Sequence, residues 1–310
     1  MLVNQRILVT TSTFAVVDRT PIQLMEAAGY EVCLNPFQRR LTRSEVMELL
    51  TDETVVGLVA GLEPLDRGVL TKSCLHVISR VGSGISNVDL DAARDLGIDV
   101  HTTPDGPTSA VAELTLGALL GLLREIPALS EDLHNGRWVK RTGGQIEGRT
   151  ILVVGGGRIG IRVAKSLDAL GAEILVCDPY LSASACDYSV VSLHEGYAEA
   201  DVISFHNSGE DCLLGKDDLP RLKPGVFVLN AARGSVVSEL AVLDGLEQKI
   251  IAGVWLDVFQ DEPYSGLLVG HKKILLTPHI GSYTSECRTR MERDAVENLL
   301  ASLGVMEPSA

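Results

Sequence analysis

The chain has 310 residues, of which 45% are hydrophobic and 22% charged, a balance typical of a folded globular protein with one large or two ordinary domains. Its net charge of −14 argues against a nucleic-acid backbone or an anionic membrane as the main partner. An anionic small molecule is compatible with this charge if its site is built from a few arginines or backbone N–H groups.

The beginning of the chain and its cysteines bear on location. The N-terminal segment MLVNQRILVTTST has no apolar core followed by a small-residue cleavage site, so we expect no signal peptide. The longest apolar run, residues 114–123, is too short to span a bilayer. The six cysteines are scattered, with no C-x-x-C pair, and no His pair has metal-ligand spacing. We therefore expect a cytoplasmic protein with reduced thiols, no metal and no membrane partner.

Short β-rich runs alternate with helical runs through residues 1–100. We predict strands at 7–10, 31–34, 55–60 and 77–79, and helices at 21–28 and 44–50. This alternation predicts a parallel sheet with helices on both faces.

A second unit follows the Pro/Gly-rich segment 101–107. It opens with a long apolar helix at 108–124 and an irregular arm at 133–148. Strand and helix patterns then alternate again, with strands at 150–154, 174–177, 202–205, 226–230, 251–255 and 274–277, a helix at 161–170, and a last helix at 285–303. About six strands fit a doubly wound nucleotide-binding sheet.

The strongest local motif is G-x-G-x-x-G, formed by Gly155, Gly157 and Gly160 between an apolar strand and a helical run. In such a turn the first glycine allows the tight bend, the second lets a pyrophosphate approach, and the third lets helix and strand touch. Asp178 ends the next strand, where a carboxylate would accept hydrogen bonds from ribose and repel a 2′-phosphate. The motif therefore predicts a dinucleotide site that prefers NAD to NADP.

Three later segments follow strands whose ends should face that cofactor. Arg233 comes just after the strand 226–230, and a guanidinium there can bind a carboxylate in bidentate fashion. Asp257 and Glu262 follow the next strand, and His279 follows the last one. A carboxylate beside His279 would fix the imidazole tautomer and keep an imidazolium available near neutral pH, which suits general acid–base chemistry.

Taken together, five motifs resemble the D-isomer-specific 2-hydroxyacid dehydrogenases, and most of all the phosphoglycerate dehydrogenase branch of that family. They are Val81-Gly-Ser-Gly84, the glycine motif with Asp178, Asn230-Ala-Ala-Arg-Gly234, Leu256-Asp-Val-Phe with Glu262-Pro263, and Thr277-Pro-His-Ile-Gly281. The resemblance runs over nearly the whole chain, with every motif in order. It implies an NAD-dependent oxidoreductase that moves a hydride between the cofactor and a small 2-hydroxy or 2-oxo acid.

The resemblance also implies roles for individual residues. Arg233 would bind the substrate carboxylate and 2-oxo group, His279 would give or take the proton, and Glu262 would be its partner. Backbone N–H groups of Ser83 and Gly84 would hold the carboxylate from the other side. The residues implied at the cofactor, besides the three glycines and Asp178, are Arg158 and Ile159 at the pyrophosphate, and Ala231, Asp257 and Ser282 at the nicotinamide.

The same resemblance implies the domain organisation. A Rossmann cofactor domain, residues 101–283, would be inserted in a flavodoxin-like substrate-binding domain made of residues 1–100 and 284–310. Both would be doubly wound parallel sheets of the α/β class, with the active cleft where they meet. The Ala-rich helix and the arm with Trp138 resemble the family's dimer contact, so we expect a homodimer.

The departures from the family pattern concern two places: the adenosine side of the cofactor pocket and the cations available to a phosphorylated substrate. Asn207 stands in a segment that often reads H-x-P-L-T in the family, so the cofactor pocket is expected to differ in detail there. A phosphorylated substrate needs cations, and Arg80, Arg39 and Arg40 are the candidates. The segment 59–64 offers none, although related phosphoglycerate dehydrogenases often carry a basic residue there.

Two other functions stay open at this point. The same scaffold acts on other acids, such as glyoxylate, hydroxypyruvate, a phosphonate-bearing acid or phosphite; formate is disfavoured because its dehydrogenases have glutamine where this chain has Glu262. An NAD(H)-sensing binding protein, like the corepressors that share the fold, would also keep Arg233, Glu262 and His279.

Overall fold

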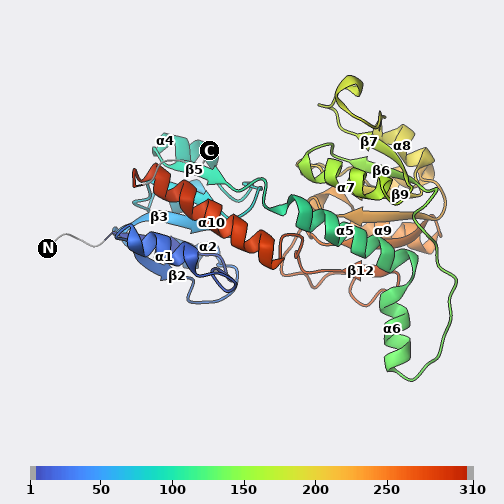
Figure 1. Ribbon diagram of the computed structural model, residues 1–310, viewed down its shortest axis with the longest axis horizontal. Helices are drawn as coiled ribbons and strands as arrows, with labels where there is room; N and C mark the ends of the chain where they lie inside the picture. The colour runs from blue at the N-terminus through green and yellow to red at the C-terminus, as the bar shows by residue number, and fades with distance from the viewer. Residues whose placement is uncertain (1–4, 306–310) are drawn as a thin grey trace. The chain divides into compact units, whose positions relative to one another are not determined.

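The computed structural model describes residues 5–305 (Figure 1), and within it the chain divides into two compact units. The first unit runs to Pro107 and resumes at Ser282, and the second is Thr108–Gly281. The divisions expected from sequence, after residues 100 and 283, lie a few residues away. The difference at the first division arises because residues 99–102 form a strand of the first unit that the sequence pattern did not predict.

The first unit is built on a five-stranded parallel sheet. Its strands pair in the order β2-β1-β3-β4-β5, the order of flavodoxin-like sheets. They are β1 (Arg6–Val9), β2 (Glu31–Leu34), β3 (Val55–Ala60), β4 (Val77–Arg80) and β5 (Asp99–Thr102). Every residue of β3 is buried, as expected for a central parallel strand covered on both faces.

Helices cover both faces of this sheet. They are α1 (Thr20–Ala27), α2 (Arg43–Leu49), α3 (Arg67–Leu70), α4 (Leu90–Asp95) and α10 (Ser285–Ser302). Figure 1 shows α10 lying along the sheet beside α1, where it contacts β3, β4 and β5. Gly57 of β3 makes room for α10, because a Cβ there would lie 3.3 Å from the Leu299 side chain. The apolar residues of α2, α3 and α4 pack in a separate cluster with Leu58 and Ile78.

The second unit contains a seven-stranded parallel sheet in the order β12-β11-β10-β9-β6-β7-β8. Counted from β6, this is the Rossmann order with one further strand at the β12 edge. The strands are β6 (Thr150–Val154), β7 (Glu173–Cys177), β8 (Ser189–Val190), β9 (Val202–Phe205), β10 (Val226–Asn230), β11 (Ile251–Leu256) and β12 (Ile274–Leu276).

Two apolar clusters bury the two faces of the second sheet. One contains residues of α5 (Pro107–Leu123) and α7 (Arg158–Asp168), together with Trp255 of β11. The other contains residues of α8 (Leu193–Glu199) and α9 (Glu239–Glu247), together with Phe205 of β9. A further helix, α6 (Ile126–His134), follows α5, and 3-10 turns occur at Ala183–Ala185, Lys216–Arg221 and Gly234–Val236.

The α/β class and the two parallel sheets predicted from sequence are confirmed. Each strand expected from the pattern is present to within a residue or two, and β5 and β8 come in addition. Helix α7 begins at Arg158 rather than at 161, because Gly157 is its N-cap. Among residues 5–305, no helix is both long and apolar enough to cross a membrane.

Candidate active site

The carboxyl ends of parallel strands meet at one edge of a sheet, and ligands of such sheets bind there. In the second unit this edge carries nearly all the residues singled out from the sequence. The glycine turn follows β6, Asp178 follows β7, and Asn207 follows β9. The neighbouring strands β10, β11 and β12 are followed by Arg233, Glu262 and His279.

The turn after β6 has the shape of a dinucleotide cradle. Gly155 has φ +100°, and a Cβ there would lie 2.6 Å from the backbone nitrogen of Asn207. Gly160 lets α7 touch the turn, because its Cβ would lie 1.9 Å from the carbonyl oxygen of Gly155. Gly157 is the N-cap of α7 and has no side chain to cap the helix, and a Cβ there would meet no atom within 4 Å. The first amide groups of a helix lack intrahelical acceptors and carry positive potential, so this turn fits a pyrophosphate.

Asp178 braces the same turn. Its Oδ2 accepts a hydrogen bond from the N–H of Gly156 at 2.7 Å, and its Oδ1 accepts one from the N–H of Tyr180 at 2.9 Å. The carboxylate is half-buried beside the glycines, where a ribose hydroxyl could reach it. Asn207 also lies beside the turn, and its Nδ2 donates to the carbonyl oxygen of Gly209 at 3.2 Å. The residues present therefore fit a dinucleotide with unphosphorylated ribose.

Arg233 is presented by a turn that Asn230 organises. The buried Asn230 side chain accepts from the N–H of Ala232 at 2.9 Å and donates to the carbonyl oxygen of Arg233 at 2.8 Å. Gly234 allows the turn to pack on the segment after β11, since a Cβ there would lie 2.0 Å from the backbone of Phe259. The Arg233 guanidinium is held by a bond from Nη1 to the carbonyl oxygen of Ala232 at 2.7 Å. Sequence reasoning assigned no role to the Asn230 side chain, although Asn is typical of such side-chain-closed turns.

His279 and Glu262 form a direct pair. His279 Nδ1 lies 2.9 Å from Oε2 and 3.1 Å from Oε1 of Glu262. The carboxylate also accepts from the N–H of Phe259 at 3.0 Å, which fixes its orientation. With Nδ1–H donated to the carboxylate, Nε2 is the ring nitrogen left to give or take a proton. The imidazole is 40% exposed and Glu262 19%, so the pair is anchored in the protein and open on the histidine side.

Asp257 has more contacts than the sequence indicated. It is 2% exposed and accepts from Thr277 Oγ1 at 2.6 Å, from the N–H of Ile280 at 2.9 Å and from the N–H of Gly281 at 2.8 Å. Burial raises the pKa of Asp257, and these hydrogen bonds oppose the rise. Its expected contact with the nicotinamide amide stays a prediction. The structure shows in addition that it holds the loop of His279.

The remaining site residues lie in the first unit, beside the turn after β10, or at the start of α7, whose first two residues are Arg158 and Ile159. Ser83 is exposed and Gly84 half-buried in the turn after β4, and Ser282 begins the second segment of that unit. Ala231 directly follows β10, and its N–H donates to the carbonyl oxygen of Phe205 at 3.2 Å. Their contacts with substrate or cofactor stay predictions.

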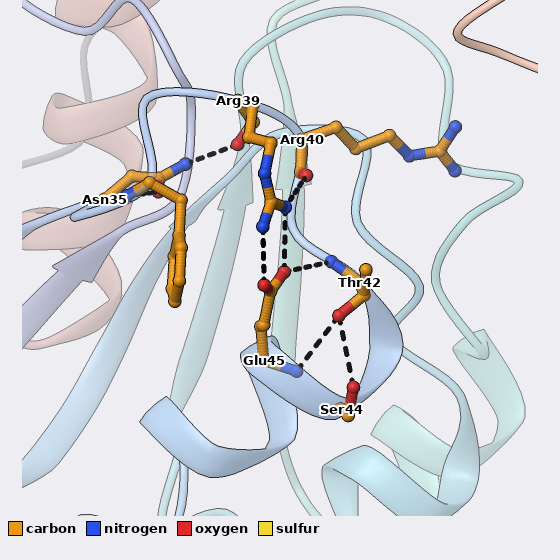
Figure 2. A network of polar contacts seen from close by, with 7 residues as sticks. Asn35, Arg39, Arg40, Thr42, Ser44 and Glu45 are labelled. Carbon is orange, nitrogen blue, oxygen red and sulfur yellow. Dashed lines mark hydrogen bonds and ion pairs between the residues drawn. The ribbon is translucent and has the colours of Figure 1, made fainter.

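The candidate phosphate-binding arginines differ in their surroundings. The Arg80 guanidinium folds over its own turn, donating from Nη1 to the carbonyl oxygen of Val81 at 3.0 Å. Figure 2 shows the Arg39 guanidinium directed at the carboxylate of Glu45, with N–O distances of 2.7 and 2.9 Å. This bidentate bond holds the pKa of Glu45 down at about 2. The Arg40 side chain extends away from that network (Figure 2), so it is better placed than Arg39 to meet an anion.

The carboxyl edge of the first sheet also holds a buried acid. Glu63, 1% exposed in the segment after β3, accepts from Thr10 Oγ1 and from the N–H of Gly61. The sequence showed that this segment lacks a cation but did not indicate that its acid is buried. Across the part of the chain described, no three His, Cys, Asp or Glu side chains are grouped to hold a metal ion.

The sheet order and the glycine turn with Asp178 define a Rossmann-type dinucleotide-binding protein, and the hydrogen-bonded pair of His279 and Glu262 lies at the same sheet edge. Residues 116–281 match the family model described as D-isomer specific 2-hydroxyacid dehydrogenase, NAD binding domain. The chain therefore belongs to the D-isomer specific 2-hydroxyacid dehydrogenase family, and its cofactor is NAD.

Curated relatives and solved structures agree with this family. D-3-phosphoglycerate dehydrogenase of Mycobacterium bovis is 36% identical over 264 residues, covering 82% of this chain and 50% of that protein. The enzyme of that name from Methanocaldococcus jannaschii is 33% identical over 259 residues, covering 80% and 49%. The chain thus spans about half the length of the curated relatives it matches.

The solved structures cover the chain more fully. The TT0316 protein from Thermus thermophilus superposes with a TM-score of 0.88 at 33% identity, covering 98% of each chain. A glyoxylate reductase from Paecilomyes thermophila gives 0.86 at 26% identity, covering 98% of this chain and 96% of that one.

The glycine turn yields a matched pair of predictions. Gly160→Ala places a methyl group against the Gly155 backbone, so we expect it to lower the free energy of unfolding by about 2 kcal/mol. Gly157→Ala meets open space at φ −75°, so its effect on stability should be below about 0.5 kcal/mol. It should instead weaken NADH binding about tenfold, by blocking the pyrophosphate. Denaturant unfolding measures the stability of the two variants, and NADH titration measures their affinity for the cofactor. An equal loss of stability in Gly157→Ala and Gly160→Ala would contradict the roles assigned to these glycines.

Proposed function

We propose that this chain is an NAD(H)-dependent dehydrogenase that interconverts a small 2-oxo acid and the corresponding 2-hydroxy acid. The observation that carries the proposal is the hydrogen-bonded pair of His279 and Glu262, which lies at the sheet edge that also carries Arg233 and the glycine turn. This combination offers a proton donor and a carboxylate-binding cation where a nicotinamide would be bound.

NAD would be held by the second unit. The turn Gly155–Gly160, with Arg158 and Ile159, would hold the pyrophosphate, and Asp178 would accept from the ribose hydroxyls. Ala231, Asp257 and Ser282 would line the nicotinamide, with Asn207 on the adenosine side. When bound, the nicotinamide supplies or accepts the hydride.

The chain's own residues would handle the acid and the proton. Arg233 would bind the substrate carboxylate and the 2-oxo oxygen. As the hydride adds to C2, Nε2 of His279 would donate a proton to the oxygen, giving the 2-hydroxy acid and a neutral imidazole. In the oxidative direction Nε2 would accept that proton. Glu262 would stabilise the imidazolium and hold the ring in the tautomer that exposes Nε2.

Asp178 would set the preference for NADH over NADPH. Asp178→Asn keeps an oxygen for the N–H of Gly156, loses the acceptor for the N–H of Tyr180, and removes the charge that repels a 2′-phosphate. We expect the ratio of kcat/KM for NADH to that for NADPH to fall about tenfold, which corresponds to about 1.4 kcal/mol. Steady-state kinetics with both cofactors measures it, and an unchanged ratio would remove Asp178 from this role.

The substrate class is the finer part of the proposal. The curated relatives are named D-3-phosphoglycerate dehydrogenase, and one structural neighbour is titled a glyoxylate reductase. Arg39 is bonded to Glu45 and Arg80 to its own turn, so Arg40 is the main candidate among the three for a substrate phosphate. The discriminating experiment compares NADH oxidation with 3-phosphohydroxypyruvate, hydroxypyruvate, glyoxylate and phosphonopyruvate. A preference for the first that Arg40→Ala removes would support a phosphorylated substrate, and equal or better turnover of the unphosphorylated acids would contradict it.

We also propose that the chain is a homodimer that uses α6 and the arm that follows it, which contains Trp138. Ile126, Leu133 and Val139 are exposed there, and Trp138 is 80% exposed. Exposed apolar side chains grouped in one segment are typical of a protein interface. Light scattering measures the mass of the particle, and a monomer at micromolar concentration would contradict the proposal.

A further inference from the structure

The backbone of His279 has an uncommon conformation. Its φ is +54°, in the left-handed region that residues other than Gly and Asn rarely adopt. Such a conformation persists where surrounding contacts hold it, and it occurs often at functional sites. The contacts that hold His279 are therefore part of what places its imidazole beside Glu262.

Asp257 supplies two of these contacts. Its carboxylate binds the N–H groups of Ile280 and Gly281, the two residues that directly follow His279, at 2.9 and 2.8 Å. Before the histidine, the carbonyl oxygen of Thr277 accepts the His279 N–H at 2.9 Å. The loop is thus fastened on both sides of the imidazole, and a shift of Asp257 would move it.

Asp257 is in turn held by a chain of directed hydrogen bonds. The indole Nε1–H of Trp255 can only donate, and it donates to Thr277 Oγ1 at 2.9 Å. Because Thr277 Oγ1 accepts from the indole, its own hydroxyl proton is donated to the carboxylate. The distance from Thr277 Oγ1 to Asp257 Oδ1 is 2.6 Å. Trp255 is completely buried in the cluster under α5 and α7, so this chain ties the active-site loop to the apolar core.

We propose that Thr277, supported by Trp255, is a positioning residue for the reaction: it orients Asp257, which fixes the loop that aims His279 at Glu262 and at the substrate. This inference rests on the proposed function. Thr277 acts through Asp257 and does not itself touch the reacting atoms.

The test compares Thr277→Val, which removes the hydroxyl and nearly keeps the shape, with Thr277→Ser, which restores the hydroxyl. A displacement of about 1 Å at a catalytic group costs up to about 100-fold in rate. We therefore expect Thr277→Val to lower kcat for 2-oxo acid reduction about 10- to 100-fold and to change the KM for NADH by less, because Asp257 is the one proposed cofactor contact that depends on Thr277. Thr277→Ser should recover most of the rate. Trp255→Phe, which removes the donor behind the threonine, should lower kcat in the same direction by less.

A second readout does not depend on turnover. The proton NMR spectrum of the wild-type chain should contain a downfield Nδ1–H resonance from the His279–Glu262 bond, identified by its loss in His279→Gln. We expect it to be lost or shifted in Thr277→Val and restored in Thr277→Ser. Wild-type kcat and an unchanged resonance in Thr277→Val would overturn the inference, and so would an equal loss of rate in the serine variant. If the wild-type chain reduces no 2-oxo acid, the proposed function fails, and the resonance alone decides the positioning role.

Discussion

His279→Ala is expected to lower kcat for 2-oxo acid reduction by about 10²- to 10⁴-fold, the range that a positioned general acid contributes. The variant removes the ring whose Nδ1 is bound to Glu262 and whose Nε2 would deliver the proton. NADH binding should change little, because the glycine turn and Asp178 lie after other strands of the sheet.

The control for this prediction is His194→Ala, which removes an exposed histidine of α8 in the same unit. It should keep wild-type kcat and wild-type NADH affinity. Steady-state kinetics and NADH fluorescence titration measure both quantities. A His279→Ala variant with near-normal kcat would remove the acid–base role of the histidine.

Arg233→Ala is expected to lower kcat/KM for the 2-oxo acid about 10²- to 10³-fold. Breaking a charge-assisted pair that is shielded from water costs about 3–4 kcal/mol, and each 1.4 kcal/mol is tenfold. The guanidinium is already half-buried and bonded to the carbonyl oxygen of Ala232, so little ordering remains to be done when the carboxylate arrives.

Arg233→Lys tests whether the planar fork matters as well as the charge. A lysine ammonium keeps the charge but not the bidentate geometry, so it should recover only part of the lost kcat/KM. Arg221→Ala, in the 3-10 turn after β9, removes an exposed arginine of the same unit and should leave kinetics unchanged. Wild-type kcat/KM in Arg233→Ala would contradict carboxylate binding by this residue.

The sequence predicted the central strands because each is an apolar run bounded by turn residues. The short edge strands escaped prediction: β5 at the edge of its sheet reads Asp-Val-His-Thr, and β8 has two residues. Helices α8 and α9 were also not predicted from the sequence. Each contains a glycine, and glycine lowers helix propensity. Packing explains both glycines, since a Cβ at Gly196 would lie 2.5 Å from Leu152 and one at Gly245 would lie 2.6 Å from Ile251.

Site residues could be predicted from the sequence where a single short motif contains all the residues that perform one function. The glycine turn and Asp178 beside it follow from residue type and position after a strand, whereas the pairing of Glu262 with His279 was implied by the family resemblance. The Trp255–Thr277–Asp257 chain could not be predicted, because it joins the ends of two strands that are adjacent only in the folded sheet. The bond between Arg39 and Glu45 likewise depends on the loop before α2, whose shape the sequence pattern does not specify.

The decisive experiment on the proposed reaction measures NADH consumption and product formation together, with the wild-type chain and a panel of 2-oxo acids. We expect NADH to be oxidised only when a 2-oxo acid is present, and one molecule of the 2-hydroxy acid, as the D isomer, to form for each NADH consumed. Tight NADH binding with no reduction of any acid in the panel would contradict the proposed reaction and would favour an NAD(H)-sensing binding protein.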